Sequence, residues 1–292
     1  MRAGWVHSEE TFTATIAVIA PGAMGSAIAA RLHGNGARIL TVLAGRSAVT
    51  IARAQESGME GVEETALAEA DLILSIVPPA EAANLAIRLS PLLAAAVRKP
   101  VYVDCNALNV VTKRGVAAVI GQAGAPFIDA AIIGAPPKSG ERGPRFYVSG
   151  DDLSASVALR EMGLDVRPVE GGVGAASALK MSYAGINKGL TALAAVMVLA
   201  AGRAGAANAL HAELAESEPE LLARFSRVLP DMVPKAYRWV AEMDEIASFL
   251  ENDDGGRLMF DGAGRVYERL SAKCDGDEVG QLKAFAAAAE RP

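Results

Sequence analysis

The sequence Ile16-Ala-Val-Ile-Ala-Pro-Gly-Ala-Met-Gly25 decides the fold of this chain. It begins with an apolar run short enough to be a buried strand and continues into a glycine turn, after which residues 26–32 have a helix-compatible composition. A break at Gly34-Asn-Gly36 precedes a second apolar run over residues 38–43. Strand, glycine turn, helix and strand within about thirty residues predict a βαβ unit that binds a dinucleotide.

Each residue of this turn that would contact the pyrophosphate has its own role. Gly22 lets the backbone approach the phosphates, and Gly25 lets the helix pack closely on the strand. The amides of Ala23 and Met24 open the helix, where its dipole favours negative charge. In the pattern G-x-G-x-x-G the first glycine is Ala20, so the turn must suit an L-residue. A plain strand-to-helix turn is the alternative, and the flanking strand and helix favour the cofactor.

The end of the second strand indicates which dinucleotide is bound. An NAD site needs a carboxylate there for the ribose 2′-hydroxyl, but no acidic residue occurs between Thr11 and Gln55. Arg46 and Ser47 stand at this end, and a guanidinium and a hydroxyl can hold a 2′-phosphate by charge-assisted hydrogen bonds. We therefore expect NADP (NADPH) in preference to NAD. The alternative is that Arg46 is a solvated loop arginine.

Composition excludes several classes of function. With 292 residues, half of them apolar, the chain is globular and has ample core. A net charge of −6 and the lack of a basic run argue against nucleic acid and membrane surfaces as partners. Cys105, Cys274 and the three scattered histidines build no metal site, and so few cysteines fit a reducing cytoplasm. Residues 1–14 are expected to be a flexible leader, and the uncharged run 189–202 is too short to span a bilayer.

Apolar runs alternate with helical patterns up to about residue 150, which predicts a mainly parallel sheet covered by helices on both faces. Further strands are expected at 71–77, 101–103 and 127–133, and helices at 80–89 and 111–122. Ligands bind beyond the carboxyl ends of such strands. One crevice should therefore contain the Ala20 turn, Arg46, Val77-Pro78, Asn106 and Gly134-Ala135. The loop 134–145 is either a flap carrying Lys138, Arg142 and Arg145 or a connection to a strand at 146–149.

After Gly171-Gly-Val-Gly174 only helical patterns remain, at 175–202, 205–228, 232–250, 262–271 and 279–289. We therefore expect an α/β Rossmann-type domain over residues 1–170 and an all-helical domain over 171–292. On the first of these helices Lys180, Tyr183, Ala184 and Asn187 share one face. Such polar groups on an apolar helix indicate a general acid or base with orienting neighbours. The alternative is a lysine that extends from the helix start to solvent.

Three segments, in order along nearly the whole chain, resemble the β-hydroxyacid dehydrogenases. This family includes 3-hydroxyisobutyrate and 6-phosphogluconate dehydrogenases, and the imine reductases are its relatives. Ala20-Pro-Gly-Ala-Met-Gly25 resembles the family's glycine turn, and Asp129-Ala-Ala-Ile-Ile-Gly-Ala135 resembles its substrate strand. Gly171-Gly-Val-Gly-Ala-Ala-Ser-Ala-Leu-Lys180 is similar to its hinge and catalytic-lysine motif. The remainder, including Tyr237-Arg-Trp-Val-Ala-Glu-Met243, resembles a less characterised subgroup with its own C-terminal helical domain.

The resemblance implies an NAD(P)-dependent oxidoreductase acting at the carbonyl or hydroxyl carbon of a small hydroxy acid, aldehyde or ketone. Lys180 matches the general acid/base, and Asn106 matches a strand-end position beside the nicotinamide. The substrate-binding positions that the resemblance implies are Asn106, Gly134, Ala135, Tyr183, Asn187 and Arg238. It also implies a homodimer formed through the helical domain.

The chain departs from the family pattern at several of these positions. Ile133 replaces the serine that contacts the substrate carboxylate, and Tyr183 and Ala184 replace the asparagine one turn after the lysine, for which Asn187 can substitute. Arg238 aligns loosely with a second lysine. An imine reductase and a non-catalytic NADP-binding redox sensor are the alternatives. Retention of Lys180 argues against both, because imine reductases commonly carry another proton donor there and a sensor needs only the nucleotide site.

Overall fold

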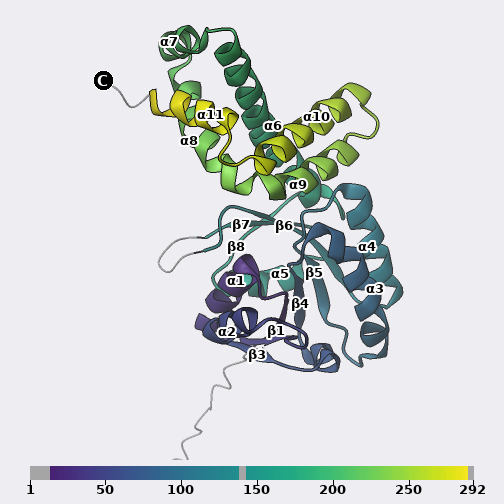
Figure 1. Ribbon diagram of the computed structural model, residues 1–292. Helices are drawn as coiled ribbons and strands as arrows, with labels where there is room; N and C mark the ends of the chain where they lie inside the picture. The colour runs from purple at the N-terminus through teal and green to yellow at the C-terminus, as the bar shows by residue number, and fades with distance from the viewer. Residues whose placement is uncertain (1–13, 138–142, 289–292) are drawn as a thin grey trace, which may run out of the picture. The chain divides into compact units, whose positions relative to one another are not determined.

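The computed structural model describes residues 14–137 and 143–288, and it divides into two compact units, Met1–Ser177 and Ala178–Pro292 (Figure 1). The sequence predicts this boundary seven residues earlier, at residue 170. The expected leader lies, up to residue 13, outside the described residues, and so do Lys138 and Arg142 of the expected flap. Each unit is described below by itself.

The first unit is built on one sheet of eight strands in the order β3-β2-β1-β4-β5-β6-β7-β8. All neighbouring strands are parallel except β6 and β7. This confirms the mainly parallel sheet and the Rossmann-type class. The strands are β1 (Thr15–Ile19), β2 (Arg38–Thr41), β3 (Met59–Gly61), β4 (Leu72–Ser75), β5 (Val101–Asp104), β6 (Phe127–Ile133), β7 (Arg145–Ser149) and β8 (Asp165–Pro168).

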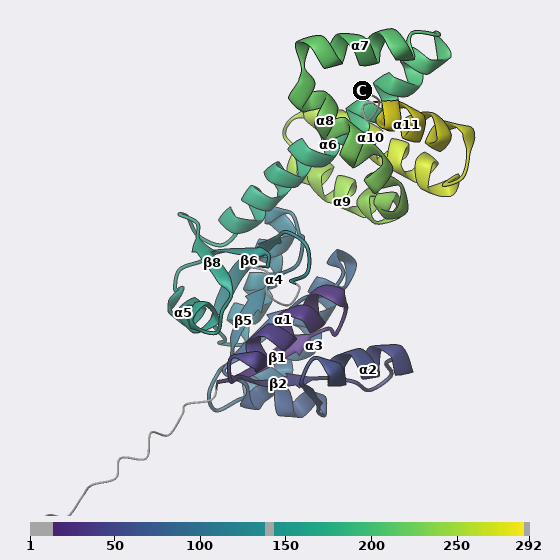
Figure 2. The same ribbon diagram turned by 90° about the vertical axis from the view of Figure 1, so that its left-hand side faces the viewer.

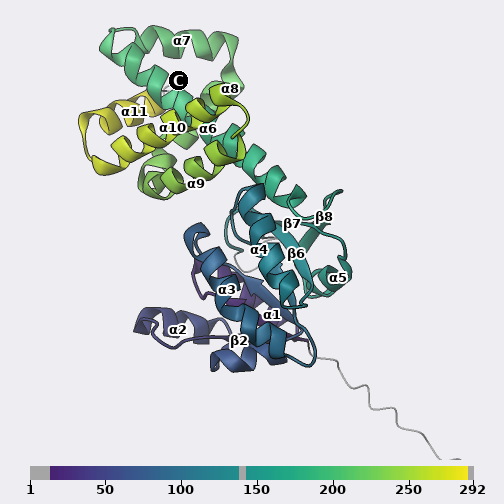
Figure 3. The ribbon, with the colours of Figure 1, turned by 90° about the vertical axis from the view of Figure 1, so that its right-hand side faces the viewer.

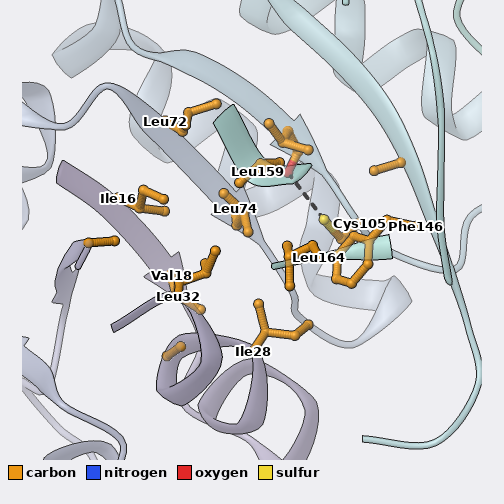
Figure 4. Close-up of a cluster of buried hydrophobic side chains, with 14 of the residues drawn as sticks. Ile16, Val18, Ile28, Leu32, Leu72, Leu74, Cys105, Phe146, Leu159 and Leu164 are labelled. Atoms are coloured by element: carbon orange, nitrogen blue, oxygen red, sulfur yellow. Dashed lines mark hydrogen bonds between the residues drawn. The ribbon is translucent and has the colours of Figure 1, made fainter. Parts of the chain in front are cut away.

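Helices cover both faces of the sheet, so alternate residues of β1 belong to two different cores. Ile16 and Val18 face α1 (Ala23–Gly34) and α5 (Ser154–Glu161), as Figure 4 shows for the labelled side chains. Ala17 and Ile19 face α3 (Pro79–Ala95) and α4 (Val110–Gln122). Figures 2 and 3 show the two helical layers. Burial on both faces explains why the strands are almost continuously apolar in sequence.

Several short elements of this unit gave no clear pattern in the sequence. Helix α2 (Ala48–Glu56) buries only Ala54 among its residues, so it carries no apolar stripe. Strand β3 has three residues. The 3-10 helix η1 (Glu64–Glu69), α5 and β8 are also short. Periodicity needs a longer segment with one buried face, and these elements lack it.

The second unit is entirely helical, apart from turns, in the part that the structure describes. It contains α6 (Ala175–Arg203, beginning three residues before the unit), α7 (Ala207–Ser217), α8 (Pro219–Met232), η2 (Val233–Lys235), α9 (Ala236–Phe249), α10 (Asp254–Ala272) and α11 (Asp277–Ala288). The single helix expected over 205–228 was wrong, because the chain breaks at Glu218 and Pro219 starts α8. Helix α10 begins earlier than expected, where Asp253 accepts a hydrogen bond from the Gly256 amide.

Helix α6 organises the helical unit. Phe260 of α10 packs against Gly185 and Gly189, where an added Cβ would lie 3.2 Å from its ring. By length and composition alone this helix could cross a membrane, with a mean hydropathy of 1.6 and 39% of its apolar window buried. Core helices of soluble proteins pass the same test.

Neither cysteine forms a disulfide. Cys105 is buried in the core of Figure 4, and Cys274 is exposed.

Candidate functional site

The glycine turn at the end of β1 contains Gly22 and Gly25, whose surroundings differ. A Cβ built on Gly25 would lie 2.2 Å from the carbonyl oxygen of Ala20, so the close packing of α1 on the turn requires glycine there. A Cβ on Gly22 would meet nothing within 4 Å, and Gly22 is exposed with a φ of −77°. No contact within the described part of the chain therefore demands glycine at position 22. The open space in front of it can be filled by a ligand.

The start of α1 fits the pyrophosphate of a dinucleotide. Gly22 is its N-cap residue, no side chain caps it, and its first turn contains no acidic residue. The first amides of a helix have no intrahelical acceptor, and here Ala23, Met24 and Gly25 supply them. These amides and the positive end of the helix dipole favour an anion. The residues present therefore suit the phosphates of a nucleotide cofactor.

The adjacent strand ends meet the glycine turn. The Ala20 amide donates to the carbonyl oxygen of Ile76 (3.3 Å). The Val77 amide donates to Oδ1 of Asn106 (2.7 Å), and Nδ2 of Asn106 donates to the hydroxyl of Ser75 (2.8 Å). The structure thus brings the turn, Val77-Pro78 and Asn106 to one edge, as expected from the parallel sheet. Asn106 is 2% exposed and ties β4 to β5.

Arg46 and Ser47 follow β2 in a turn whose Gly45 has a φ of +72°. Arg46 is exposed, whereas the Ser47 hydroxyl caps α2 by accepting from the Thr50 amide (3.3 Å). Nε and Nη2 of Arg38 donate to the two carboxylate oxygens of Glu60 of β3, both at 2.8 Å, and this hydrogen-bonded pair lowers the pKa of the Glu60 carboxyl. The segment 42–47 that follows β2 contains no acidic residue.

The segment that resembles the substrate strand is β6, and its Asp129 has a structural partner. Its fully buried carboxylate accepts from the amides of Gly174 and Ser177 (both 3.0 Å) and from the Ser177 hydroxyl (2.7 Å). Asp129 therefore caps the start of α6 from the sheet. At the other end of β6, Ile133 is 9% exposed, and Gly134 has a φ of +133° and would bring an added Cβ within 3.0 Å of Pro144.

One buried lysine, on helix α4, was not foreseen from the sequence. Lys113 of α4 is fully buried, and its ammonium donates to Oδ1 of Asp104 and to the Asp104 carbonyl oxygen, both at 2.9 Å. The signal was present in the sequence, since Lys113 lies at helical spacing from Val116 and Ile120, both of which are buried. A lysine in an apolar stripe indicates a buried cation with partners.

The polar residues expected on α6 fall into two groups. Lys180 is half-buried and Tyr183 is 48% exposed. Asn187 is occupied within the helical unit, because its Nδ2 donates to the Tyr183 carbonyl oxygen and its Oδ1 accepts from Nη2 of Arg224, both at 2.7 Å. Arg224 was not foreseen. Arg238 lies apart on α9, exposed, with its guanidinium 5.8 Å from the ring centre of Tyr237.

A second lysine of α6 was also not assigned a role. Lys188 forms an ion pair with Glu242 of α9, and its Nζ lies 5.3 Å from the ring centre of Trp239. The Tyr267 hydroxyl of α10 donates to the Lys188 carbonyl oxygen. Lys188 therefore joins α6, α9 and α10. The role of the Lys188 side chain is therefore structural, because its contacts hold these helices together.

Comparison with protein families decides the identity of the first unit. Residues 15–163, more than half of the chain, match the NAD binding domain of 6-phosphogluconate dehydrogenase. The chain belongs to this family. Residues 201–270 match a domain of unknown function, which covers most of the helical unit. No curated protein matches the chain in sequence.

Solved structures agree with this assignment. One is a conserved protein of unknown function with structural similarity to 3-hydroxyacid dehydrogenases, 27% identical at a TM-score of 0.70, covering 92% of this chain and 99% of that one. A 3-hydroxyisobutyrate dehydrogenase from Mycobacterium tuberculosis is 19% identical at a TM-score of 0.73, covering 94% and 99%. An imine reductase from Myxococcus stipitatus in complex with NADP+ is 17% identical at a TM-score of 0.54, covering 94% and 99%. The last two likenesses concern the fold alone.

The two glycines of the turn should respond differently to alanine. Gly22→Ala adds a methyl group where the chain leaves open space, so we expect unchanged thermal stability and at least a tenfold weaker binding of NADPH, about 1.4 kcal/mol. Gly25→Ala places a methyl group against a backbone oxygen, so stability and binding should both fall. Melting curves and fluorescence titration measure the two quantities. Unchanged NADPH affinity in Gly22→Ala would place the nucleotide elsewhere.

Proposed function

We propose that the protein is an NADPH-dependent oxidoreductase acting on the carbonyl or hydroxyl carbon of a small hydroxy acid, aldehyde or ketone. The observation that carries the proposal is the glycine turn of a 6-phosphogluconate dehydrogenase-type domain, held beside Val77 and Asn106 by hydrogen bonds. When bound, the nicotinamide supplies or accepts the hydride. The chain supplies the phosphate-binding amides and the proton donor.

The preference for NADPH rests on the end of β2. Arg46 is exposed and stands beside the N-terminus of α2, which has no acidic residue in its first turn. A guanidinium next to a helix N-terminus without carboxylates suits a phosphate monoester far better than a ribose hydroxyl. The imine reductase among the solved structures binds NADP+, and a variant of it binds NAD+. Arg46 is thus the residue on which the preference depends.

Lys180 is the proposed general acid/base. It lies on α6, three residues after Ser177, whose amide and hydroxyl are bound by Asp129. In the reduction its ammonium donates a proton to the substrate oxygen, and in the oxidation its amine removes the hydroxyl proton. Tyr183 is a further hydroxyl donor, whereas Asn187 serves the helical unit through Arg224.

We further propose that two copies pair through the helical unit. Ile186, Leu193 and Met197 form an exposed apolar stripe on α6, and Met259 of α10 borders the same groove. The exposed fractions of these side chains lie between 52% and 72%. Monomeric proteins rarely expose a large contiguous apolar surface, and a twofold dimer would cover this stripe with the same stripe of a second copy. A reducing cytoplasm suits the two cysteines, neither of which forms a disulfide.

The cofactor preference is tested by one substitution. Fluorescence titration of the wild type should show NADPH bound more tightly than NADH. In Arg46→Ala the affinity for NADPH should fall about tenfold or more, and that for NADH should stay the same, because a charge-assisted pair to phosphate contributes roughly 1.5–3 kcal/mol. Arg160→Ala, at an exposed residue of α5, is the control for loss of positive charge. Equal losses for both nucleotides would remove Arg46 from the 2′-phosphate site.

The chemistry is tested by replacing Lys180. Aldehydes, keto acids and imines are screened with NADPH, and turnover of the best substrate is followed in Lys180→Ala and Lys180→Arg. Loss of a general acid should lower kcat about 10²–10⁴-fold while NADPH affinity stays unchanged. Arginine keeps the charge but cannot lose its proton, so it should not restore the rate. Full turnover in Lys180→Ala contradicts the mechanism, and turnover confined to imines supports the imine reductase.

The dimer is tested by mass. Light scattering of the wild type should give twice the monomer mass, and Leu193→Asp should give the monomer, because a buried unpaired carboxylate opposes association. Ile87→Asp on α3 is a matched control, since Ile87 is 59% exposed and Leu193 is 57% exposed. A Leu193→Asp protein that remains dimeric would move the interface away from this stripe.

A further inference from the structure

Helix α4 places an ammonium group in the interior of the sheet-containing unit. The side chains of Lys113, Asp104 and Asp129 have no exposed surface. Nζ of Lys113 lies 2.9 Å from Oδ1 of Asp104 and 3.5 Å from Oδ1 of Asp129. A charge buried this completely is stable only when it is paired and hydrogen-bonded. We call these three side chains the buried charge cluster.

The geometry of the sheet makes the lysine necessary. Asp104 of β5 and Asp129 of β6 are register partners on neighbouring parallel strands, so their carboxylates stand side by side. Two adjacent charged carboxylates in a dry interior repel each other. In the part of the chain that the structure describes, Lys113 is the cation paired with both. It therefore holds two neighbouring strands together.

One side of the cluster reaches the cofactor edge. The Lys113 ammonium donates to the carbonyl oxygen of Asn106 (3.2 Å), and the Asn106 amide donates to Oδ1 of Asp104 (2.9 Å). Both backbone groups of Asn106 are thus bound by the cluster. Its side chain is bound in turn by Ser75 and Val77. The position of Asn106 therefore depends on Lys113 directly and, through Asp104, indirectly.

The other side of the cluster reaches the start of α6. Oδ1 of Asp129 faces the Lys113 ammonium, and Oδ2 accepts from the amides of Gly174 and Ser177. Helix α4 also contacts this segment directly. Nε of Arg114 donates to the Val173 carbonyl oxygen (3.2 Å), and a Cβ on Gly174 would lie 2.8 Å from Val110. Helix α4 therefore contacts the Asn106 edge through Lys113 and the residues just before α6 through Arg114 and Val110.

We propose that Lys113 is a positioning residue for the reaction. Its ammonium holds Asn106 directly and, through Asp129, the segment 174–177 of the same unit, so that the nicotinamide edge and this segment are set by one buried charge. The inference rests on the proposed function in one respect, which is the assignment of the nicotinamide to the Asn106 edge. Lys113 itself is fully buried and does not reach a ligand.

Two nucleotides separate positioning from general damage. In our proposal NADPH engages the glycine turn, Arg46 and the Asn106 edge, whereas 2′-phospho-ADP-ribose lacks the nicotinamide and engages only the turn and Arg46. In Lys113→Met we expect the Kd of NADPH to rise about tenfold and the Kd of 2′-phospho-ADP-ribose to stay unchanged. Ile120→Ala is the control, because Ile120 is fully buried on the same helix and is not part of the cluster. It should leave both dissociation constants unchanged.

A second variant covers the case in which Lys113→Met does not fold. In the double variant Lys113→Met with Asp104→Asn, a single carboxylate remains, and it is the one bound by the amides of α6. The amide oxygen introduced at position 104 still accepts from the Asn106 amide, so this hydrogen bond is kept while the ammonium is lost. The same selective loss of NADPH affinity is expected. Hydrogen exchange without nucleotide should be at least tenfold faster at residues 174–178 than in Ile120→Ala.

The outcomes are distinct. Equal weakening of both nucleotides, or exchange at residues 174–178 no faster than in the Ile120→Ala control, overturns the positioning role. If the wild type binds neither nucleotide, the proposed function fails, and the exchange measurement without nucleotide still decides whether Lys113 holds the start of α6. Selective loss of NADPH affinity together with faster exchange supports the proposal.

Discussion

The ion pair between Lys113 and two neighbouring carboxylates is the interaction on which the rest of the candidate site depends. Without the ammonium, Asp104 and Asp129 would stand side by side on adjacent strands of a dry sheet with no cation between them. The chain uses these carboxylates to bind backbone groups: Asp104 binds the amide of Asn106, and Asp129 binds the first amides of α6. The two carboxylates, which are costly to bury, thereby hold these backbone amides in fixed positions.

The nucleotide site, by contrast, is built almost without side chains. Gly25 is required because the helix lies so close to the turn, and Gly22 leaves space in front of uncapped helix amides. Backbone amides recognise what all dinucleotides share, which is the pyrophosphate. In our proposal, discrimination between dinucleotides then depends on a single exposed side chain, Arg46. Among the solved structures, one imine reductase is found with NADP+ and a variant of it with NAD+.

The sequence predicted the parts of this protein that depend on local pattern. The βαβ unit, the parallel sheet and the helical second half follow from apolar periodicity and from the glycine turn. Helix α2 could not be predicted in this way, because it buries a single residue. The partner of Asp129 lies 45 and 48 residues away at Gly174 and Ser177, and no local pattern records such a contact. The resemblance placed the substrate at Gly134 and Ala135, beyond the other end of this strand, and gave Asp129 no role, whereas the structure shows that Asp129 caps a helix start.

The two cysteines of the chain differ in how accessible their thiols are to reagents. Cys105 is 4% exposed in the core between β5 and its neighbours, whereas Cys274 follows α10 at the surface. Reagents attack the accessible thiolate, so a maleimide probe attaches to the folded protein at one position, in the helical unit and far along the chain from the glycine turn. The wild-type sequence thus accepts a single fluorophore or spin label without any cysteine having to be removed.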